Sequence, residues 1–369
     1  MTRDTTHTTL RGAAAAAALS LSLLPAGAGA ARAQSQSPVA RAADAEVERA
    51  EKALARGDAA GAVAVLKPVA ERRKTDADAW YYLGLALSRA DKNKDARKAF
   101  EKSLKLRPGS APAHTGLALA LLRLGKPRDA AREADRAVSL DPAYGDAHFV
   151  AAAARQGEGK YAQALEEAEA ALRLRPDFPV AAALAADALL NVYVEESARA
   201  AERHPVPPGA DEAARRPALA QRDAALAPLR ERMRAAADRL AAFAASHADA
   251  PAAAEWRETA EMLRVYGGAG AGDNVYRQSE VTTKAIIIFK PEPSFTDAAR
   301  NHNVSGVVRL RAVLTADGQV RHILVLKWLP DGLTQKAVAA ARQIRFTPAT
   351  RDGVPVSQFV VLEYNFNVY

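Results

Sequence analysis

The sequence predicts a helical repeat array followed by a small α+β domain, so its fold class is α plus (α+β). Two observations carry this prediction. Proline recurs every 34 residues at Pro108, Pro142 and Pro176, within a long region of helical patterning. After a glycine-rich stretch at residues 267–276, apolar and polar residues alternate, as is typical of strands. The length of 369 residues is enough for two or three domains.

The first 33 residues have the layout of a secretory signal peptide. Arg3 and Arg11 precede an uncharged run from Gly12 to Leu24, and Ala31-Arg32-Ala33 has the form of a cleavage site. The uncharged run is shorter than the roughly 20 residues that a membrane-spanning helix needs. We therefore expect export and a mature start at Gln34. An uncleaved N-terminus that anchors the chain in the inner membrane is the alternative.

A 34-residue repeat organises the helical region at residues 34–204. Three copies are clear, at 77–110, 111–144 and 145–178, and a degenerate copy precedes them at 43–76. Small residues at Gly84 and Ala96 allow paired helices to approach closely, while Trp80 and Phe100 fill the space between them. Pro108 cannot continue the second helix. Further helices without a clear period are predicted over residues 205–266, at roughly 219–247 and 252–265.

The copy at 77–110 resembles the tetratricopeptide repeat, with Trp80, Leu83, Gly84, Ala96, Phe100 and Pro108 at the positions of that family. The resemblance implies a concave groove for a partner protein. Its lining is expected from the first helix of each pair, at Tyr81, Leu85, Arg89, Thr115, Leu122, Arg123, Phe149, Ala153 and Gln156. Arg89 and Arg123 share a register, which suggests capture of a peptide carboxylate. Two solvated arginines are the alternative.

The composition excludes several kinds of chemistry. With no cysteine there is no disulfide, no thiolate metal site and no thiol nucleophile. The glycines at 267–272 follow a helical pattern and no βαβ unit comes after them, so they indicate a linker and not a dinucleotide site. We expect no catalytic residue, metal or cofactor. A net charge of +8 would suit nucleic acid, but an exported protein is expected to meet other partners, such as proteins or anionic wall polymer.

Short strands and two helices are predicted in the C-terminal domain, residues 277–369. A helix is expected from Thr296 to Asn301, and a strand at 304–315 has one apolar face and one face with Arg309 and Arg311. A hairpin turn at Asp317-Gly318 leads to a strand at 319–328, in which a three-residue step between apolar positions predicts a β-bulge. A helix at 333–344 and a final strand at 356–368 complete a three-stranded antiparallel sheet with two helices.

Residues 284–369 resemble the C-terminal domain of TonB, the periplasmic energy transducer for outer-membrane receptors. The motifs that carry the resemblance are Pro293-Ser294-Phe295, Ala299-Arg300, Gly306, Asp317-Gly318-Gln319-Val320, Ala341, Arg345-Phe346-Thr347-Pro348 and Asp352-Gly353. The resemblance implies that an extended receptor segment adds as a strand to the sheet edge. The final strand has no proline or lysine from Ser357 onward to protect an edge. The expected contact residues are Pro293, Phe295, Arg300, Gln358, Phe359, Val361, Glu363 and Asn365.

These features favour a non-enzymatic periplasmic adaptor, whose C-terminal domain docks an outer-membrane receptor or another envelope protein while the repeats hold a second, unidentified protein. An energy transducer anchored in the inner membrane is the first alternative. The run from Gly12 to Leu24 lacks the functional histidine of the best-known TonB proteins, and repeats replace their proline-rich spacer. A peptidoglycan-associated scaffold is the second alternative. Nucleic acid is not an expected partner.

Overall fold

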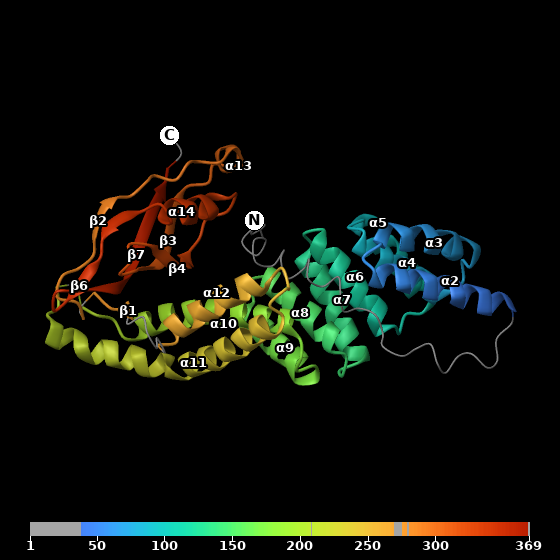
Figure 1. The fold of residues 1–369 in the computed structure, drawn as a ribbon, viewed down its shortest axis with the longest axis horizontal. Coiled ribbons are helices and arrows are strands. Elements are labelled where there is room, and N and C mark those ends of the chain that lie inside the picture. Colours follow the sequence, from blue (N-terminus) through green and yellow to red (C-terminus); the bar gives the residue numbers. More distant parts are fainter. Residues whose placement is uncertain (1–37, 208, 269–274, 279, 368–369) are drawn as a thin grey trace. The chain divides into compact units, whose positions relative to one another are not determined.

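The computed structural model describes residues 38–207, 209–268, 275–278 and 280–367 (Figure 1). The predicted signal peptide at 1–33 and most of the predicted linker lie outside the described residues. Two compact units divide the chain between Ala188 and Leu189. Each unit is built around its own core.

Consecutive helix pairs form the first unit, as the 34-residue period predicts. The succession of helices can be followed from blue to green in Figure 1. The pairs are α2 (Pro38–Ala55) with α3 (Ala59–Arg72), α4 (Ala77–Arg89) with α5 (Asn93–Leu106), α6 (Ala111–Arg123) with α7 (Pro127–Leu140), and α8 (Gly145–Gly157) with α9 (Tyr161–Leu174). The first part of α10 (Pro179–Arg203) follows them.

Phe100 fills the space between α4, α5 and α6 and is fully buried. A Cβ atom on Gly84 would lie 2.7 Å from the Phe100 ring, and one on Gly116 would lie 2.5 Å from it. Both distances are shorter than any normal contact, so the two glycines leave the space that the ring occupies. The sequence predicted this role for Gly84 but not for Gly116, which belongs to the next repeat.

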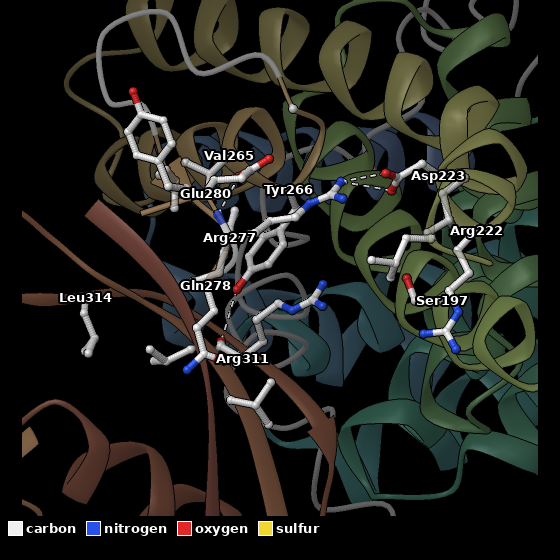
Figure 2. A pocket seen from close by; sticks show the side chains of 18 of the residues that line it. Ser197, Arg222, Asp223, Val265, Tyr266, Arg277, Gln278, Glu280, Arg311 and Leu314 are labelled. Carbon is white, nitrogen blue, oxygen red and sulfur yellow. Dashed lines mark hydrogen bonds and ion pairs between the residues drawn. The ribbon is translucent and has the colours of Figure 1, made fainter. Parts of the chain in front are cut away.

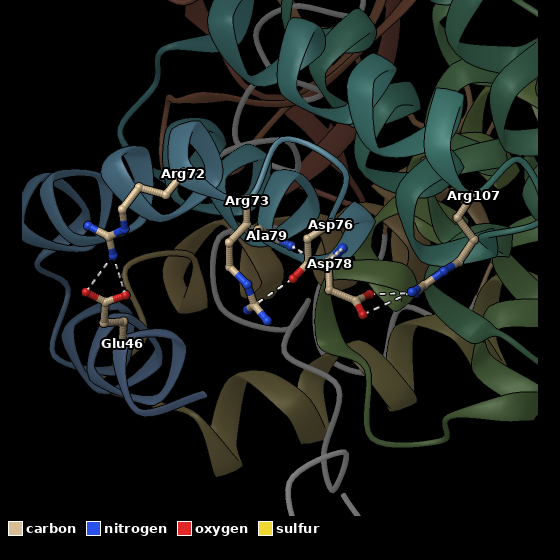
Figure 3. A network of polar contacts seen from close by, with 7 residues as sticks. All are labelled: Glu46, Arg72, Arg73, Asp76, Asp78, Ala79 and Arg107. Carbon is tan, nitrogen blue, oxygen red and sulfur yellow. Dashed lines mark hydrogen bonds and ion pairs between the residues drawn. The ribbon is translucent and has the colours of Figure 1, made fainter. Parts of the chain in front are cut away.

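Ion pairs fix the helix ends of the repeats (Figure 3). Arg72 of α3 pairs with Glu46 of α2 at 2.8 Å, and Arg107 after α5 pairs with Asp78 of α4. Asp76 accepts a hydrogen bond from the backbone amide of Asp78, and so caps α4. The cap satisfies backbone amides at the start of α4 that have no partner within the helix.

The second unit begins with the rest of α10 and continues with α11 (Glu212–Ser246) and α12 (Ala253–Tyr266). The sequence predicted that the middle helix starts near Leu219, and this start is wrong. The helix begins at Glu212 because the Asp211 carboxylate caps it, accepting a hydrogen bond from the Ala214 amide at 2.8 Å. The predicted helix at 252–265 agrees closely with α12.

An antiparallel sheet forms the centre of the C-terminal domain, in the strand order β1-β7-β3-β4. Its three long strands, as predicted, are β3 (Gly306–Leu314), β4 (Val320–Lys327) and β7 (Val354–Phe366), and the two helices are α13 (Asp297–Asn301) and α14 (Leu333–Ala341). Four shorter strands were not predicted: β1 (Val275–Tyr276) runs parallel to β7, β6 (Ala349–Arg351) pairs with β7, and β2 (Ile286–Phe289) pairs separately with β5 (Arg345–Thr347).

The core of this domain lies between one face of the sheet and α14. Every second residue of β3 and β7 is buried there, with Val308, Leu310, Ala312, Leu314, Leu362, Tyr364 and Phe366 at 3% exposure or less. The predicted bulge is present in β4, where Arg321 pairs with Val313 and Leu324 with Arg311, so that β4 has two residues between these pairs and β3 has one. His322 accommodates it with a φ of 51°.

Candidate functional site

The outer side of β7 is the candidate site, because most of it has no paired strand. On the inner side β7 pairs with β3 from Gly306–Phe366 to Leu314–Gln358. On the outer side only Ser357 and Gln358 are paired, with Val275 and Tyr276 of β1. The sequence suggested an unprotected sheet edge along the final strand from Ser357 onward, but β1 covers the start of this edge. From Phe359 to Phe366, no strand of the described part of the chain pairs with it on this side.

Backbone groups of alternate residues along β7 point outward. The carbonyl oxygen of Glu363 accepts a hydrogen bond from Lys290 Nζ, and therefore points away from β3. Backbone directions alternate along a strand, so Phe359, Val361 and Asn365 direct their amides and carbonyls to the same side. These groups are the donors and acceptors that an added strand would need. All four residues were predicted from the sequence as contact residues.

Residues 285–290 flank this edge without pairing with β7 as a strand. The backbone amide of Ala285 donates to Gln358 Oε1 at 2.8 Å, and Lys290 Nζ binds Glu363 at the other end. Lys290 Nζ also lies 4.5 Å from the centre of the Tyr364 ring. Between these two contacts, the residues of β2 are exposed apolar side chains, including Ile286 at 60% and Ile288 at 70%. Each contact involves one side chain, Gln358 or Lys290, while β2 itself pairs with β5.

A cavity of about 1120 Å³ lies beside the edge, between the outer face of the sheet and helices α10 to α12 (Figure 2). Phe359 to Leu362 of β7 line it from the sheet, together with β1. The Phe359 ring lies 5.6 Å from that of Tyr266 at the end of α12. The Tyr266 hydroxyl lies 2.7 Å from the carbonyl oxygen of His322 and 3.1 Å from that of Arg311, and donates to them. Burial raises the pKa of this hydroxyl, so it remains a donor.

Asp223 of α11 joins the helices to the segment after β1. Its carboxylate lies 2.9 Å from a guanidinium nitrogen of Arg277 (Figure 2). It also lies 2.9 Å from a guanidinium nitrogen of Arg230. Burial acts to raise the pKa of Asp223, but the two arginines outweigh it, and the pKa lies below its ordinary value. The carboxylate is therefore ionised at neutral pH. The Arg351 guanidinium lies 4.9 Å from the centre of the ring of Tyr276, the residue before Arg277.

The other predicted contact residues of this domain lie away from the outer side of β7. Phe295 is half-buried and packs edge-on against Phe366, with ring centres 5.6 Å apart. The exposed Arg300 lies with its guanidinium 6.0 Å from the Phe295 ring, and Pro293 is half-buried. Phe295 therefore supports the end of β7. Sequence reasoning missed Arg311 and Tyr266, although the alternation of β3 had already placed Arg311 on the outer face.

The predicted groove of the repeat array is mostly occupied by its own packing. Five of its predicted lining residues are at most 8% exposed: Tyr81, Leu85, Thr115, Phe149 and Gln156. Arg89 donates to the Leu54 carbonyl at 3.4 Å, and Arg123 donates to the Ser88 carbonyl at 2.6 Å. Leu122 is half-buried. Both arginines therefore donate to backbone carbonyls of the preceding repeat. They are not the two solvated side chains of the alternative interpretation.

Among the described residues, no group of three or more histidine, aspartate or glutamate side chains could hold a metal ion. Within the same residues, no helix is both long and apolar enough to span a bilayer. The features that remain are a strand edge and a repeat array.

Stacked helix pairs joined to a small sheet with an unpaired strand edge are the arrangement of a protein-interaction scaffold. Comparison with protein families identifies both parts. Residues 291–368 match the Gram-negative bacterial TonB protein C-terminal family, and residues 77–110 and 115–177 match tetratricopeptide repeat families. The chain thus contains a TonB C-terminal domain preceded by tetratricopeptide repeats. Both are non-catalytic interaction modules and indicate a protein-interaction role in the envelope.

Comparison with curated protein sequences gives no match. Among solved structures, MamA from residue 41 to its end, from Desulfovibrio magneticus RS-1, is 26% identical over 43% of this chain and 89% of that one, with a TM-score of 0.37. Another crystal structure of MamA is 20% identical over 51% and 91%, with a TM-score of 0.36. The first TPR of Spaghetti (RPAP3), bound to an HSP90 peptide, is 25% identical over 30% and 89%, with a TM-score of 0.30.

Proposed function

We propose that this protein is a periplasmic adaptor of the cell envelope. Its TonB C-terminal domain takes an extended segment of an outer-membrane receptor, or of another envelope protein, as an added strand on β7. Its repeat array holds a second protein. The observation that carries the proposal is the outer side of β7, which has no paired strand from Phe359 to Phe366 among the described residues.

The opposite edge of the sheet suits strand addition less well. Strand β4 has two irregularities in its pairing with β3, and His322 has a left-handed backbone at one of them. Arg321 and Lys327 place charges along it. Bulges and charges are the features that protect an edge strand from pairing. The outer side of β7 has a continuous run without a bulge in its pairing to β3.

Backbone pairing alone would give weak binding. Each new hydrogen bond contributes about 1 kcal/mol net, while ordering a free peptide costs about 1 to 2 kcal/mol per residue. Side-chain contacts must therefore contribute. Val361, which is 54% exposed, and the apolar residues of β2 offer such contacts beside the edge. A partner segment with apolar side chains at alternate positions would bury them.

Site-specific photocrosslinking in cells tests this proposal. A photoreactive amino acid at Val361 should form an adduct with an envelope protein, because this side chain borders the unpaired edge. The matched control is Val354, which lies on the same strand and is 62% exposed, but stands at the hairpin with β6. We expect an adduct from position 361 and none from position 354.

The identity of the adduct separates the proposal from its rivals. An outer-membrane receptor or a periplasmic protein would support the adaptor. Adducts with wall fragments alone would favour a peptidoglycan scaffold and count against strand addition. N-terminal sequencing of the mature protein tests the anchored transducer: a start near Gln34 would exclude it, and an intact N-terminus in the membrane fraction would favour it over the adaptor.

A further inference from the structure

Arg311 is the arginine of the cavity whose side chain shows neither an ion pair, a hydrogen bond nor an aromatic contact within the described residues. The other arginines that line the cavity have partners: Arg230 and Arg277 pair with Asp223, Arg222 donates to the carbonyls of Ala201 and His204, and Arg351 lies over Tyr276. Arg311 is half-buried and extends from β3 into the cavity (Figure 2). A half-buried cation without a counter-charge is costly unless water or a ligand compensates it.

The sheet register places this cation next to the unpaired edge. Arg311 lies directly across from Val361 of β7, and both side chains point to the outer face. In the neighbouring row on the same face, Arg309 lies across from Glu363 and pairs with it at 2.7 Å. Across from Arg311, β7 thus has the apolar Val361, whereas across from Arg309 it has the carboxylate of Glu363. The neighbour on the other side, Leu324 of β4, is apolar as well, and the two acidic residues of the cavity already bind Arg230 and Arg277. A strand added beyond β7 would be placed to supply the counter-charge.

A strand added to β7 would bring side chains to that place. Strands lie about 4.8 Å apart, so a residue opposite Val361 on an added strand would have its Cα about 10 Å from that of Arg311. Its side chain would point to the same face as Val361 and Arg311. An arginine and a glutamate that lean toward each other across Val361 can span this distance. Five arginines and two acidic residues line the cavity, and this excess of positive charge favours an anionic guest.

We propose that Arg311 selects the partner: the segment that adds to β7 is an extended, acidic stretch with a carboxylate opposite Val361, and Arg311 binds that carboxylate inside the cavity. This inference rests on strand addition, the proposed function, and adds the charge of the partner to it. Arg311 acts as a specificity residue and takes no part in the backbone pairing.

The inference is tested with the full chain and three labelled nine-residue peptides of alternating valine and threonine, with glutamate, glutamine or lysine at the centre. Affinity is measured by fluorescence anisotropy at constant ionic strength. The glutamate peptide should bind the wild type about three to ten times more tightly than the glutamine peptide. In Arg311→Gln this preference should disappear, and in Arg311→Glu the lysine peptide should become the tightest. Arg321→Gln, which removes an exposed arginine at the hairpin, should keep it.

Each result has a distinct meaning. A glutamate preference that persists in Arg311→Gln would overturn the role of Arg311 while leaving strand addition intact. Equal binding of all three peptides by the wild type would do the same. Failure of every peptide to bind, together with unchanged hydrogen exchange of the β7 amides, would overturn strand addition and the inference with it. Arg311→Lys keeps the charge and should retain a preference for glutamate, which separates loss of charge from loss of folding.

Discussion

One residue position in each repeat performs the same task with different side chains. Trp80 donates through Nε1 to the Lys74 carbonyl at 3.0 Å. His114 and His148 stand one and two periods later, and their Nε2 atoms lie 3.0 Å from the carbonyls of Pro108 and Pro142. Each histidine also contacts a carboxylate, of Glu133 or Glu167, at 2.7 Å. These two repeats lack the aromatic side chain, but their histidines keep the polar link to the preceding turn.

At the same scale, Gly116 should be intolerant of any side chain. Gly116→Ala would place a methyl group 2.5 Å from the buried Phe100 ring, and such overpacking typically costs about 1 to 3 kcal/mol. We expect the melting temperature to fall by several degrees in a thermal denaturation experiment. Gly145→Ala is the control, because its new Cβ would meet neighbours only at 3.6 Å or more. An equal melting temperature for the two variants would contradict the packing described for Phe100.

At the scale of elements, β1 determines how much of β7 a partner can use. It pairs with two residues of β7, and few contacts hold it: the Arg351 guanidinium over Tyr276 and the ion pair of Arg277 with Asp223. The adjoining segment is fixed by the contacts of Ala285 and Lys290 with β7. This short parallel strand lies where an incoming segment would extend or replace it. The chain thus covers the start of its own binding edge.

Weakening β1 should therefore strengthen partner binding. Tyr276→Ala removes the aromatic face under Arg351, an interaction of about 0.5 to 1 kcal/mol at an exposed site. If β1 competes with the partner strand, peptide affinity should rise about two- to fivefold. Anisotropy with the glutamate peptide measures this. Lys327→Ala, at the far edge of the sheet, should leave the affinity unchanged. A lower affinity in Tyr276→Ala would show that β1 assists the partner and does not compete with it.

At the scale of the whole molecule, two interaction modules lie on one chain, and α10 from Leu189 onward, α11 and α12 belong to the same compact unit as the sheet. The Tyr266 hydroxyl reaches the carbonyls at the bulge of β4, and Asp223 reaches Arg277 beside β1. These helices therefore form one wall of the cavity beside the binding edge. Helices α10 to α12 thus form part of the candidate site.

The Asp223 cluster should make the stability of this unit depend on pH. The folded-state pKa of Asp223 lies below its unfolded value near 4, so its contribution is fully present above that pH and is lost as pH falls through the lower folded value. Denaturation from pH 6 to pH 2.5 should show Asp223→Asn less stable than the wild type, by about 1 kcal/mol, at the upper end. The difference should shrink toward the lower end. Asp238→Asn, which breaks a more exposed pair with Arg264, is the control, and a constant difference for Asp223→Asn would contradict the cluster.

Much of the fold could be predicted because its signals are local. The 34-residue period specifies helix pairs, and the alternation in β3 and β7 specifies which face is buried. The step in β4 also located the bulge. The short strands β1, β2, β5 and β6 escaped prediction because two to four residues carry no measurable period, and their pairing depends on distant parts of the chain. The cavity escaped for the same reason: Arg311 and Tyr266 lie 45 residues apart, and only folding brings them together.

The recurrence of the contacts along the array also bears on how its length can change. Removing residues 111–144 would place His148 six residues after Pro108, where His114 had stood, and would keep its carboxylate partner Glu167 at the same spacing. Insertion or loss of whole 34-residue blocks would thus keep the polar links between neighbouring repeats, while the packing around Phe100 would have to adjust, because Val150 would take the place of Gly116.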